Sequence, residues 1–317
     1  MEHEMITNNI STLEMTHDEW LKRRFESIGA SESGSILGIN PWKTAVDVYY
    51  EKVDKVTDFP DNLNMWLGRE LEPVIKKRFE EESGFKVRND HKIRVDKEYS
   101  FLTTNLDGMV VGEKVPVEYK ALGRWDGEIP DYYFSQIQHQ IMVSESDYAY
   151  FVVLVLAAQK NFIIQKIERN DEFIKLMREE EVSFWNDHVI PCDPPAPETI
   201  EDVRRVYADS VQGSKFETNS ANLLNKINLL ADIKAEIKEK KTTCDNLQKE
   251  LMEVMQEDEA IVNKDTGHGL CTWKQTNPSL IFDRKRLMDE EPEIYGRFMK
   301  QSTPTRRFII KGGQKNG

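Results

Sequence analysis

Apolar side chains recur three and four positions apart in several segments of the chain, which is the spacing of amphipathic helices. Four such segments are residues 44–53, 64–82, 130–144 and 171–188. The second segment stops at Ser83-Gly84, a typical helix end. It also contains Pro73. Because proline lacks an N–H donor and clashes with the preceding turn, we expect the helix to kink there or to start near Glu70.

Strand patterns lie between these helices. Residues 85–95 alternate in part, and residues 101–111 and 115–119 flank a turn at Gly112, which predicts a β-hairpin. Residues 149–157 form a continuous apolar run, typical of a buried central strand, and residues 162–167 follow as its hairpin partner.

The last third of the chain has a different pattern. Four prolines between residues 191 and 197 predict an extended connector and a domain boundary. We therefore expect a first domain over residues 1–190, a connector with a short helix over 191–220, a long helix over 221–260, and a small α+β module over 261–317. That module would hold a strand pair around Gly267, a helix over residues 284–299 and a final strand over 306–311.

The long helix carries apolar residues in alternating steps of three and four, the pattern of a coiled-coil seam. Lys226 and Lys240 interrupt a seam that is otherwise formed by Leu223, Leu230, Ile233, Ile237, Cys244, Leu247, Leu251 and Val254. This seam could support an oligomer, bind a partner protein, or pack within its own chain.

Composition limits the function classes. The 317 residues, about two domains in length, carry a formal charge of −13, which argues against a protein that coats nucleic acid through bulk positive charge. The three widely spaced cysteines cannot build a Cys-rich zinc site or a four-cysteine iron–sulfur cluster. No apolar leader and no run of 18 apolar residues are evident, so we expect a soluble cytoplasmic protein.

The pattern that suggests chemistry is Asp107-Gly108 followed by Glu118-Tyr119-Lys120. Side chains two apart on a strand share a face, so Glu118 and Lys120 point together, and the hairpin returns Asp107 beside them. Two carboxylates and an ammonium suit phosphodiester hydrolysis, in which oxygen ligands hold Mg²⁺ and a cation orients water or stabilises negative charge. The alternative is a surface ion pair beside a turn aspartate.

Neighbouring segments could complete this site. Glu72 on the preceding helix could add a carboxylate, although Glu70 competes for that role and both could be solvated. Tyr133, Gln136 and Gln140 share one helix face that could be aimed at water or phosphate, or be merely polar.

An upstream segment could bind a terminal phosphate. Arg24 and Ser31 could offer a guanidinium and a hydroxyl to it, unless they are a surface arginine and a helix cap. Trp42 could stack on a base, though tryptophan more often packs, and His139 fits packing or a surface position better than a metal site.

Four linked segments resemble one family. The stretches RFESIGASESGSILGINPWKT, WLGRELEPVIKKRFEEESGF, TTNLDGMVVGEKVPVEYKALG and DYYFSQIQHQIMVS resemble, in order and spacing, the YqaJ-type viral recombinases of the lambda-exonuclease-like branch of the PD-(D/E)XK nucleases. The resemblance covers about residues 17–190. Asn-Leu stands where a proline often precedes the motif aspartate, and the loop over residues 121–131 is short for the family, which leaves its DNA-contacting arch in doubt.

The resemblance implies a fold and an activity. The fold would be an α/β restriction-endonuclease-like core, a central mixed sheet flanked by helices, with the long helix and the small α+β module appended at the C-terminus. The activity would be digestion of linear double-stranded DNA from 5′ ends, leaving 3′ single strands for an annealing protein in a bacterial cytoplasm. The cofactor would be Mg²⁺, with Mn²⁺ as a substitute, and each site would hold two ions. Family members often form toroidal trimers.

The resemblance also assigns residues. Asp107, Glu118 and Glu72 would hold metal, Lys120 and Gln136 would act in catalysis, and Tyr133 matches a motif tyrosine. Arg24 and Ser31 match the family's 5′-phosphate-binding pair. Two alternatives remain: a restriction-type or structure-specific endonuclease on the same core, and a non-catalytic scaffold of the recombination machinery.

Overall fold

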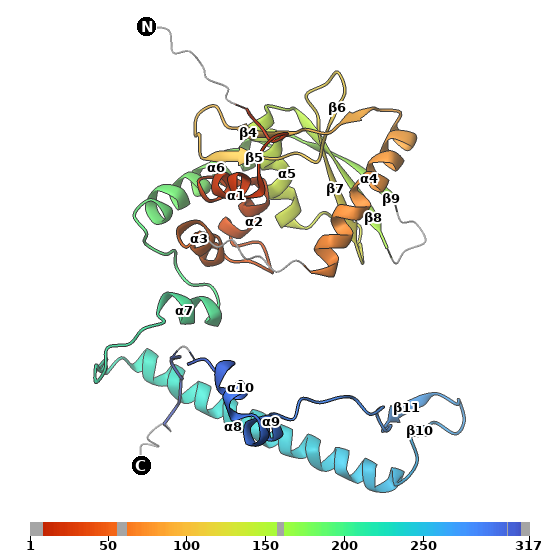
Figure 1. Cartoon of the computed structure of the whole chain (residues 1–317), viewed down its shortest axis with the longest axis vertical. Helices are drawn as coiled ribbons and strands as arrows, with labels where there is room; N and C mark the ends of the chain where they lie inside the picture. Colours follow the sequence, from red (N-terminus) through yellow and green to blue (C-terminus); the bar gives the residue numbers. More distant parts are fainter. Residues whose placement is uncertain (1–8, 56–61, 157–161, 303, 312–317) are drawn as a thin grey trace. The chain divides into compact units, whose positions relative to one another are not determined.

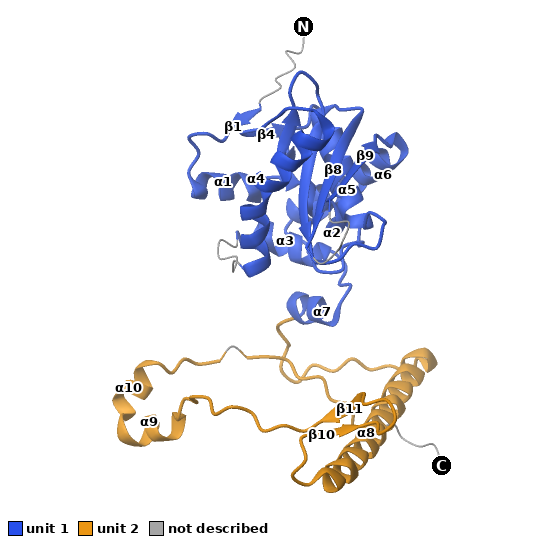
Figure 2. Ribbon diagram, turned by 90° about the vertical axis from the view of Figure 1, so that its right-hand side faces the viewer, with its two compact units in different colours: residues 1–207 blue, residues 208–317 orange. Residues whose placement is uncertain are grey.

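The computed structural model describes residues 9–55, 62–156, 162–302 and 304–311. The chain divides into two units, Met1–Tyr207 and Ala208–Gly317 (Figure 2). Residues 191–207, which the sequence suggested as part of a connector, lie with the first unit. Within the described residues, no helix is long and apolar enough to cross a membrane.

A five-stranded sheet forms the centre of the first unit. Its order is β3 (Val87–Arg88), β6 (Gly108–Val110), β7 (Pro116–Leu122), β8 (Tyr148–Val155) and β9 (Phe162–Glu168). Strands β7 and β8 pair in parallel and the other neighbours pair antiparallel, so the sheet is mixed. The two predicted hairpins, β6–β7 and β8–β9, are confirmed.

A smaller sheet has the order β1 (Ile10–Ser11), β4 (Lys92–Val95), β5 (Leu102–Thr104) and β2 (Ile28–Gly29). The single strands predicted over residues 85–95 and 101–111 are wrong, because each segment turns and contributes one strand to each sheet. Strand β2 pairs in parallel with β5, and this pairing brings the segments that follow the two strands close together.

Helices cover both faces of the larger sheet (Figure 1). From α4 (Leu63–Ser83), Ile75 and Phe79 pack in one buried cluster with β7 and β8. On the other face, Ile137 and Ile141 of α5 (Asp131–Ser144) pack on Phe151 of β8. Helix α5 is the crossover that makes β7 and β8 parallel. The expected α/β class, a mixed sheet flanked by helices, is confirmed.

The remaining helices of the first unit lie around the α5 face. They are α1 (His17–Phe25), a 3₁₀ turn at Ala30–Glu32, α2 (Ser33–Ile36), α3 (Ala45–Val53), α6 (Asp171–Phe184) with a π-helical turn at Trp185–Val189, and α7 (Ile200–Val206).

Helix α4 runs through Pro73. The predicted start near Glu70 is wrong, because Asn62 caps the helix eight residues earlier: its side-chain oxygen accepts a hydrogen bond from the Met65 N–H at 3.0 Å. The predicted end is confirmed, with Gly84 in the left-handed conformation at φ 75°.

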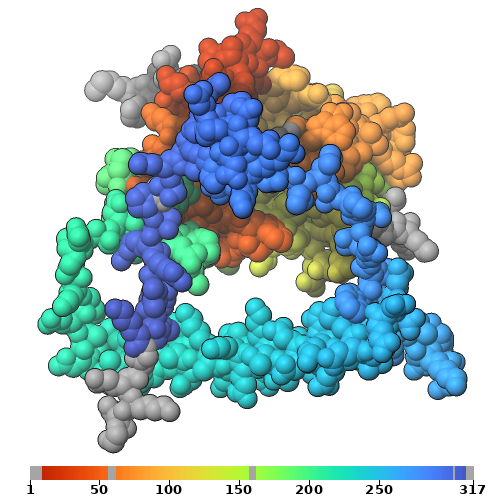
Figure 3. Space-filling model, turned by 60° about the horizontal axis from the view of Figure 1, so that its bottom comes forward, coloured from red at the N-terminus to blue at the C-terminus, as the bar shows by residue number. Residues whose placement is uncertain are grey.

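The second unit is built along α8 (Ala221–Met255), whose side chains form one long row in the cyan range of Figure 3. The strand pair β10 (Ala260–Val262) and β11 (Gly269–Thr272) is confirmed. The helix predicted over residues 284–299 is divided at Pro292 into α9 (Arg284–Glu290) and α10 (Pro292–Arg297). The predicted final strand is wrong, because residues 306–311 have no strand partner within the described chain.

Candidate active site

The β6–β7 hairpin brings the predicted catalytic residues together. Gly108 pairs with Val117, so Asp107 lies opposite Glu118 in the ladder. The Tyr119 N–H donates to Asp107 Oδ2 at 2.9 Å, and Lys120 Nζ donates to Glu118 Oε1 at 2.5 Å. Glu118 is only 2% exposed, which is incompatible with the alternative of a solvated surface pair.

Helix α5 supplies the polar side chains above this hairpin. Gln136 Nε2 donates to Glu118 Oε1 and Gln140 Nε2 donates to Glu118 Oε2, both at 2.6 Å. The ring centroid of Tyr133 lies 5.2 Å from Lys120 Nζ. Because these three residues share one helix face and α5 crosses over the face of β7 that carries Glu118, all three reach the same carboxylate–lysine pair.

Helix α4 contributes Glu72 and not Glu70. Glu70 is exposed, whereas Glu72 is half-buried. Burial, and then the negative charge of Glu118, raise the pKa of Glu72 above its usual value. Of the two candidates, Glu72 is therefore the one that faces the site.

The charges of the site act strongly on one another. Burial and the nearby Glu118 carboxylate raise the pKa of Asp107 well above its usual value. Burial acts to lower the pKa of Lys120, but the carboxylates of Glu118 and Asp107 outweigh it, so the pKa of Lys120 is raised. Lys120 is therefore an ammonium at neutral pH, suited to stabilise negative charge rather than to accept a proton.

The donors at the site suit a hard divalent cation. Within the described residues, no three His, Cys, Asp or Glu side chains are grouped closely enough to hold a metal ion, so Glu72 does not complete a three-carboxylate set with Asp107 and Glu118. Mg²⁺, however, commonly keeps several waters and is bound through one or two carboxylates. Asp107 and Glu118 supply two, and a cation between them would relieve the repulsion that raises the pKa of Asp107.

A pocket of about 140 Å³ is lined by the predicted phosphate-binding residues and by Gln136, which donates a hydrogen bond to Glu118 of the catalytic cluster. Arg24, at the end of α1, and Ser31, inside the 3₁₀ turn after β2, both line it. The other wall includes Asn105, which follows β5, and Gln136 of α5. Since β2 and β5 are neighbours, their following segments meet here. The reading of Ser31 as a helix cap is wrong, because it is neither cap residue of that turn.

Two further side chains have clear positions. Trp42 is 83% exposed and does not line this pocket, so it is not a packing residue. His139 is fully buried: its Nδ1 lies 2.8 Å from Glu181 Oε1 and its Nε2 lies 3.0 Å from the Thr103 carbonyl oxygen.

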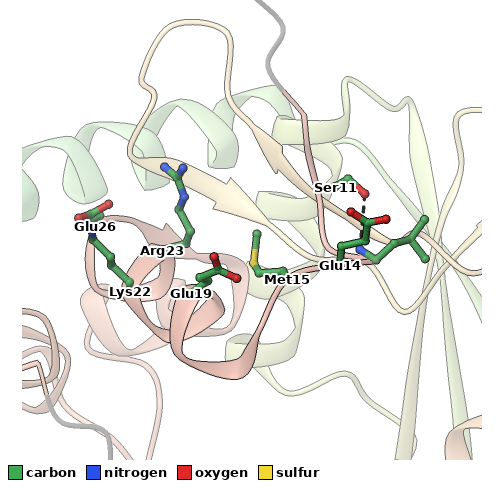
Figure 4. A pocket seen from close by; sticks show the side chains of 8 residues that line it. Ser11, Glu14, Met15, Glu19, Lys22, Arg23 and Glu26 are labelled. Carbon is green, nitrogen blue, oxygen red and sulfur yellow. Dashed lines mark hydrogen bonds between the residues drawn. The ribbon is translucent and has the colours of Figure 1, made fainter.

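A pocket of about 740 Å³ lies elsewhere on the first unit, between α1 and the segment that follows β1 (Figure 4). Side chains of both charges line it, among them Glu19, Lys22 and Arg23. None of the predicted site residues does, so its size gives no reason to place the chemistry there.

A buried ion pair that the sequence patterns did not indicate lies next to the phosphate pocket. Glu32 and Lys52 are almost fully buried, and Lys52 Nζ lies 2.7 and 2.6 Å from the two Glu32 carboxylate oxygens. Nothing in the sequence marked them, since charged residues on predicted helices are usually solvated. Glu32 directly follows Ser31, and that adjacency was the one available signal.

Residues 19–147 match the YqaJ-like viral recombinase domain. The protein YqaJ of Bacillus subtilis is 34% identical to this chain over 311 residues, which cover 94% of this chain and 95% of YqaJ. The chain belongs to the YqaJ-like viral recombinase family. The resemblance noted from the sequence motifs is thereby confirmed.

Two solved structures are similar to the chain at low identity. An alkaline exonuclease from Laribacter hongkongensis is 20% identical with a TM-score of 0.49, and the match covers 60% of this chain and 98% of that enzyme. A phage-related exonuclease from Haemophilus somnus is 16% identical with a TM-score of 0.42, over 52% of this chain and 95% of that protein.

Proposed function

We propose that this YqaJ-like chain is a Mg²⁺-dependent exonuclease that digests linear double-stranded DNA from 5′ ends and leaves 3′ single strands for phage-type recombination in a bacterial cytoplasm. The observation that carries the proposal is the position of Gln136, which lines the Arg24–Ser31 pocket and also hydrogen-bonds to Glu118 in the cluster of Asp107, Glu118 and Lys120. A phosphate held in that pocket would place the neighbouring nucleotide beside the cluster.

Each residue has a role that follows from its contacts. Asp107 and Glu118 would hold the metal, which supplies a polarised phosphate and an activated water when bound. Lys120, already protonated, stabilises the charge that develops on the phosphate oxygens. Gln136 and Gln140 fix both oxygens of Glu118, and Tyr133 packs over Lys120. Glu72 adds negative charge and would help the two carboxylates hold a second metal ion. Mn²⁺ would substitute for Mg²⁺ at these positions.

A nuclease assay tests the proposal. Purified protein with Mg²⁺ should release acid-soluble nucleotides from linear duplex DNA and leave closed circular DNA intact. Lys120→Ala should lower the rate by about 10²–10⁴-fold, as expected for loss of one positioned catalytic group. Lys166→Ala is the matched control, because Lys166 has an exposed side chain that pairs with Glu168 on the edge strand β9.

Three outcomes contradict the proposal. Equal rates in Lys120→Ala and wild type remove the catalytic assignment. Cutting of closed circles favours the endonuclease alternative, and a wild-type protein that binds linear DNA without release favours the scaffold.

We also propose two kinds of partner. The exposed apolar seam of α8 fits association with further copies of the chain, a trimer ring being the resemblance-based expectation. The 3′ single strands would pass to a single-strand annealing protein, and the second unit, residues 208–317, is the segment available to bind it.

A further inference from the structure

Arg24 is held by groups that the proposed function does not use. Its guanidinium carbon lies 5.6 Å from the centre of the Trp20 ring, and its Nε lies 3.8 Å from Glu32 Oε1. Glu32 itself lines the pocket and is 1% exposed. A carboxylate in the wall of an anion pocket is unfavourable, because it repels phosphate and neutralises the arginine that should bind it.

Lys52 of α3 balances the negative charge of Glu32. Its ammonium group has three N–H donors and the structure shows three acceptors: the two Glu32 oxygens at 2.7 and 2.6 Å and the Arg24 carbonyl oxygen at 2.7 Å. Lys52 is 3% exposed and does not line the pocket. It therefore balances the charge of Glu32 from behind and cannot bind the phosphate itself.

The same pair shapes both sides of the pocket. The Gly29 N–H donates to Glu32 Oε2 at 2.9 Å, which closes the 3₁₀ turn that presents Ser31. Lys52 ties the main chain at Arg24, where α1 ends, to this turn. Glu32 and Lys52 thus connect the two segments from which Arg24 and Ser31 extend.

We propose that Glu32 and Lys52 form an internally neutral positioning pair, in which Glu32 orients Arg24 and Lys52 cancels the charge of Glu32, so that Arg24 keeps a net positive charge for a 5′-terminal phosphate. This inference rests on the proposed 5′-end pocket. It makes Lys52 a determinant of end specificity although it does not contact the DNA.

Steady-state kinetics on duplexes with 5′-phosphate or 5′-hydroxyl ends tests the pair. The readout is the ratio of kcat/KM for the two ends, which cancels any loss of active protein. Lys52→Met should lower the wild-type ratio by about 10-fold, mainly through KM for the phosphorylated end, because Glu32, no longer balanced by Lys52, then attracts Arg24 more strongly than in the wild type.

A double variant separates charge balance from folding. Glu32→Gln with Lys52→Met removes both charges and leaves no unpaired buried ion. The ratio should return to within about three-fold of wild type, since the unbalanced charge of Glu32 no longer acts on Arg24. If the pair were purely structural, the kcat/KM ratio of the double variant would be no higher than that of Lys52→Met.

The control variant is Arg205→Met. It breaks an ion pair with Asp47 of the same helix α3 and lies outside the pocket.

The outcomes distinguish a failure of the 5′-end pocket from a failure of the positioning pair. A wild-type ratio near one, unchanged in Arg24→Ala, overturns the 5′-end pocket and this inference with it. A wild-type preference that is lost in Arg24→Ala but kept in Lys52→Met overturns only the positioning pair, as does a double variant that stays as low as Lys52→Met.

Discussion

Glu118 is the residue on which the candidate site converges. Its buried carboxylate accepts hydrogen bonds from Lys120 of β7 and from Gln136 and Gln140 of α5. Such charge-assisted bonds fix the rotamer of the carboxylate that we propose as a metal ligand. The two-residue spacing of Glu118 and Lys120 was readable in the sequence, whereas Gln140 was visible only as one of several polar residues on a helix face.

His139 is a second buried titratable residue, and its contacts favour the protonated form. Nδ1 lies 2.8 Å from Glu181 Oε1 and 3.1 Å from Ser33 Oγ, and Nε2 lies 3.0 Å from the Thr103 carbonyl oxygen. An imidazolium can donate an N–H to Glu181 and another to Thr103. Burial acts to lower the pKa of His139, but the Glu181 carboxylate and its hydrogen bond outweigh it, so the pKa is raised above its usual value. The raised pKa favours the imidazolium form, in which His139 joins α5 to α6.

A pH-dependent stability should follow from His139. Because its folded-state pKa is raised, its stabilisation is fully present below the unfolded pKa of about 6.5 and is lost as the pH rises through the folded value. His139→Gln should therefore lower the free energy of unfolding by about 1–3 kcal/mol more at pH 6 than at pH 9, measured by urea titration. The control is His91→Gln at an exposed position. An equal loss at both pH values would contradict a charged His139.

At the scale of elements, the apolar periodicity predicted the helices and strands whose position depends on local packing. It failed where a helix cap sets the start of a helix, or where a strand joins one of two sheets. Helix α5 and strand β8 followed from their apolar patterns. Helix α4 started earlier than predicted, because a good cap at Asn62 and the packing of Ile75 and Phe79 outweigh the hydrogen bond that Pro73 removes. Residues 85–95 could not be divided by sequence, since alternation does not say which of two sheets a strand joins.

Helix α8 is the element with the least internal support. Its seam residues are exposed, and Met255 is the one buried residue among the described part of residues 208–317. An apolar row of this length is typical of a helix that pairs with another helix. Glu236 and Lys241 flank the seam at positions that face each other across two parallel copies, which favours a second α8 as the partner.

The position of Cys244 makes this pairing testable. It lies in the seam, and equal seam positions meet in a parallel coiled coil, within reach of a disulfide. Mild oxidation should therefore give cross-linked chains that Cys244→Ser abolishes and Cys192→Ser retains, measured on non-reducing gels. Ile237→Asp should reduce the sedimentation coefficient. Monomeric wild-type protein, or cross-links that survive Cys244→Ser, would contradict the pairing.

At the scale of the whole molecule, the charge of −13 constrains how DNA is held. Negative charge at Glu72, Asp107 and Glu118 belongs to a site that a divalent cation would partly neutralise. Arg24 and Lys120 supply positive charge locally, so an excess of acidic residues elsewhere disfavours binding to duplex away from its ends. The total charge argues against coating of nucleic acid through bulk positive charge, and the positions of Arg24 and Lys120 fit the alternative of local contacts.

The division into two units predicts where the chain can be cut. Helix α7 packs on α3: Thr44 Oγ1 donates to Asp202 Oδ1 at 2.9 Å, and the Arg205 guanidinium lies 4.0 Å from the centre of the Tyr50 ring. A chain that ends after residue 207 keeps these contacts, whereas one that ends after residue 194 loses them. Only the longer chain should therefore match the full-length protein in stability.

Thermal melts and nuclease assays of the two truncations test this. Residues 1–207 should fold and release nucleotides from linear duplex but associate less with further copies. Residues 1–194 should be less stable by about 1–2 kcal/mol, which lowers the melting temperature by roughly 2–8 °C at this size. The difference should shrink in the background of Asp202→Asn, because that change already weakens the α3–α7 contact. Failure of residues 1–207 to fold would show that the second unit is needed for the stability of the first.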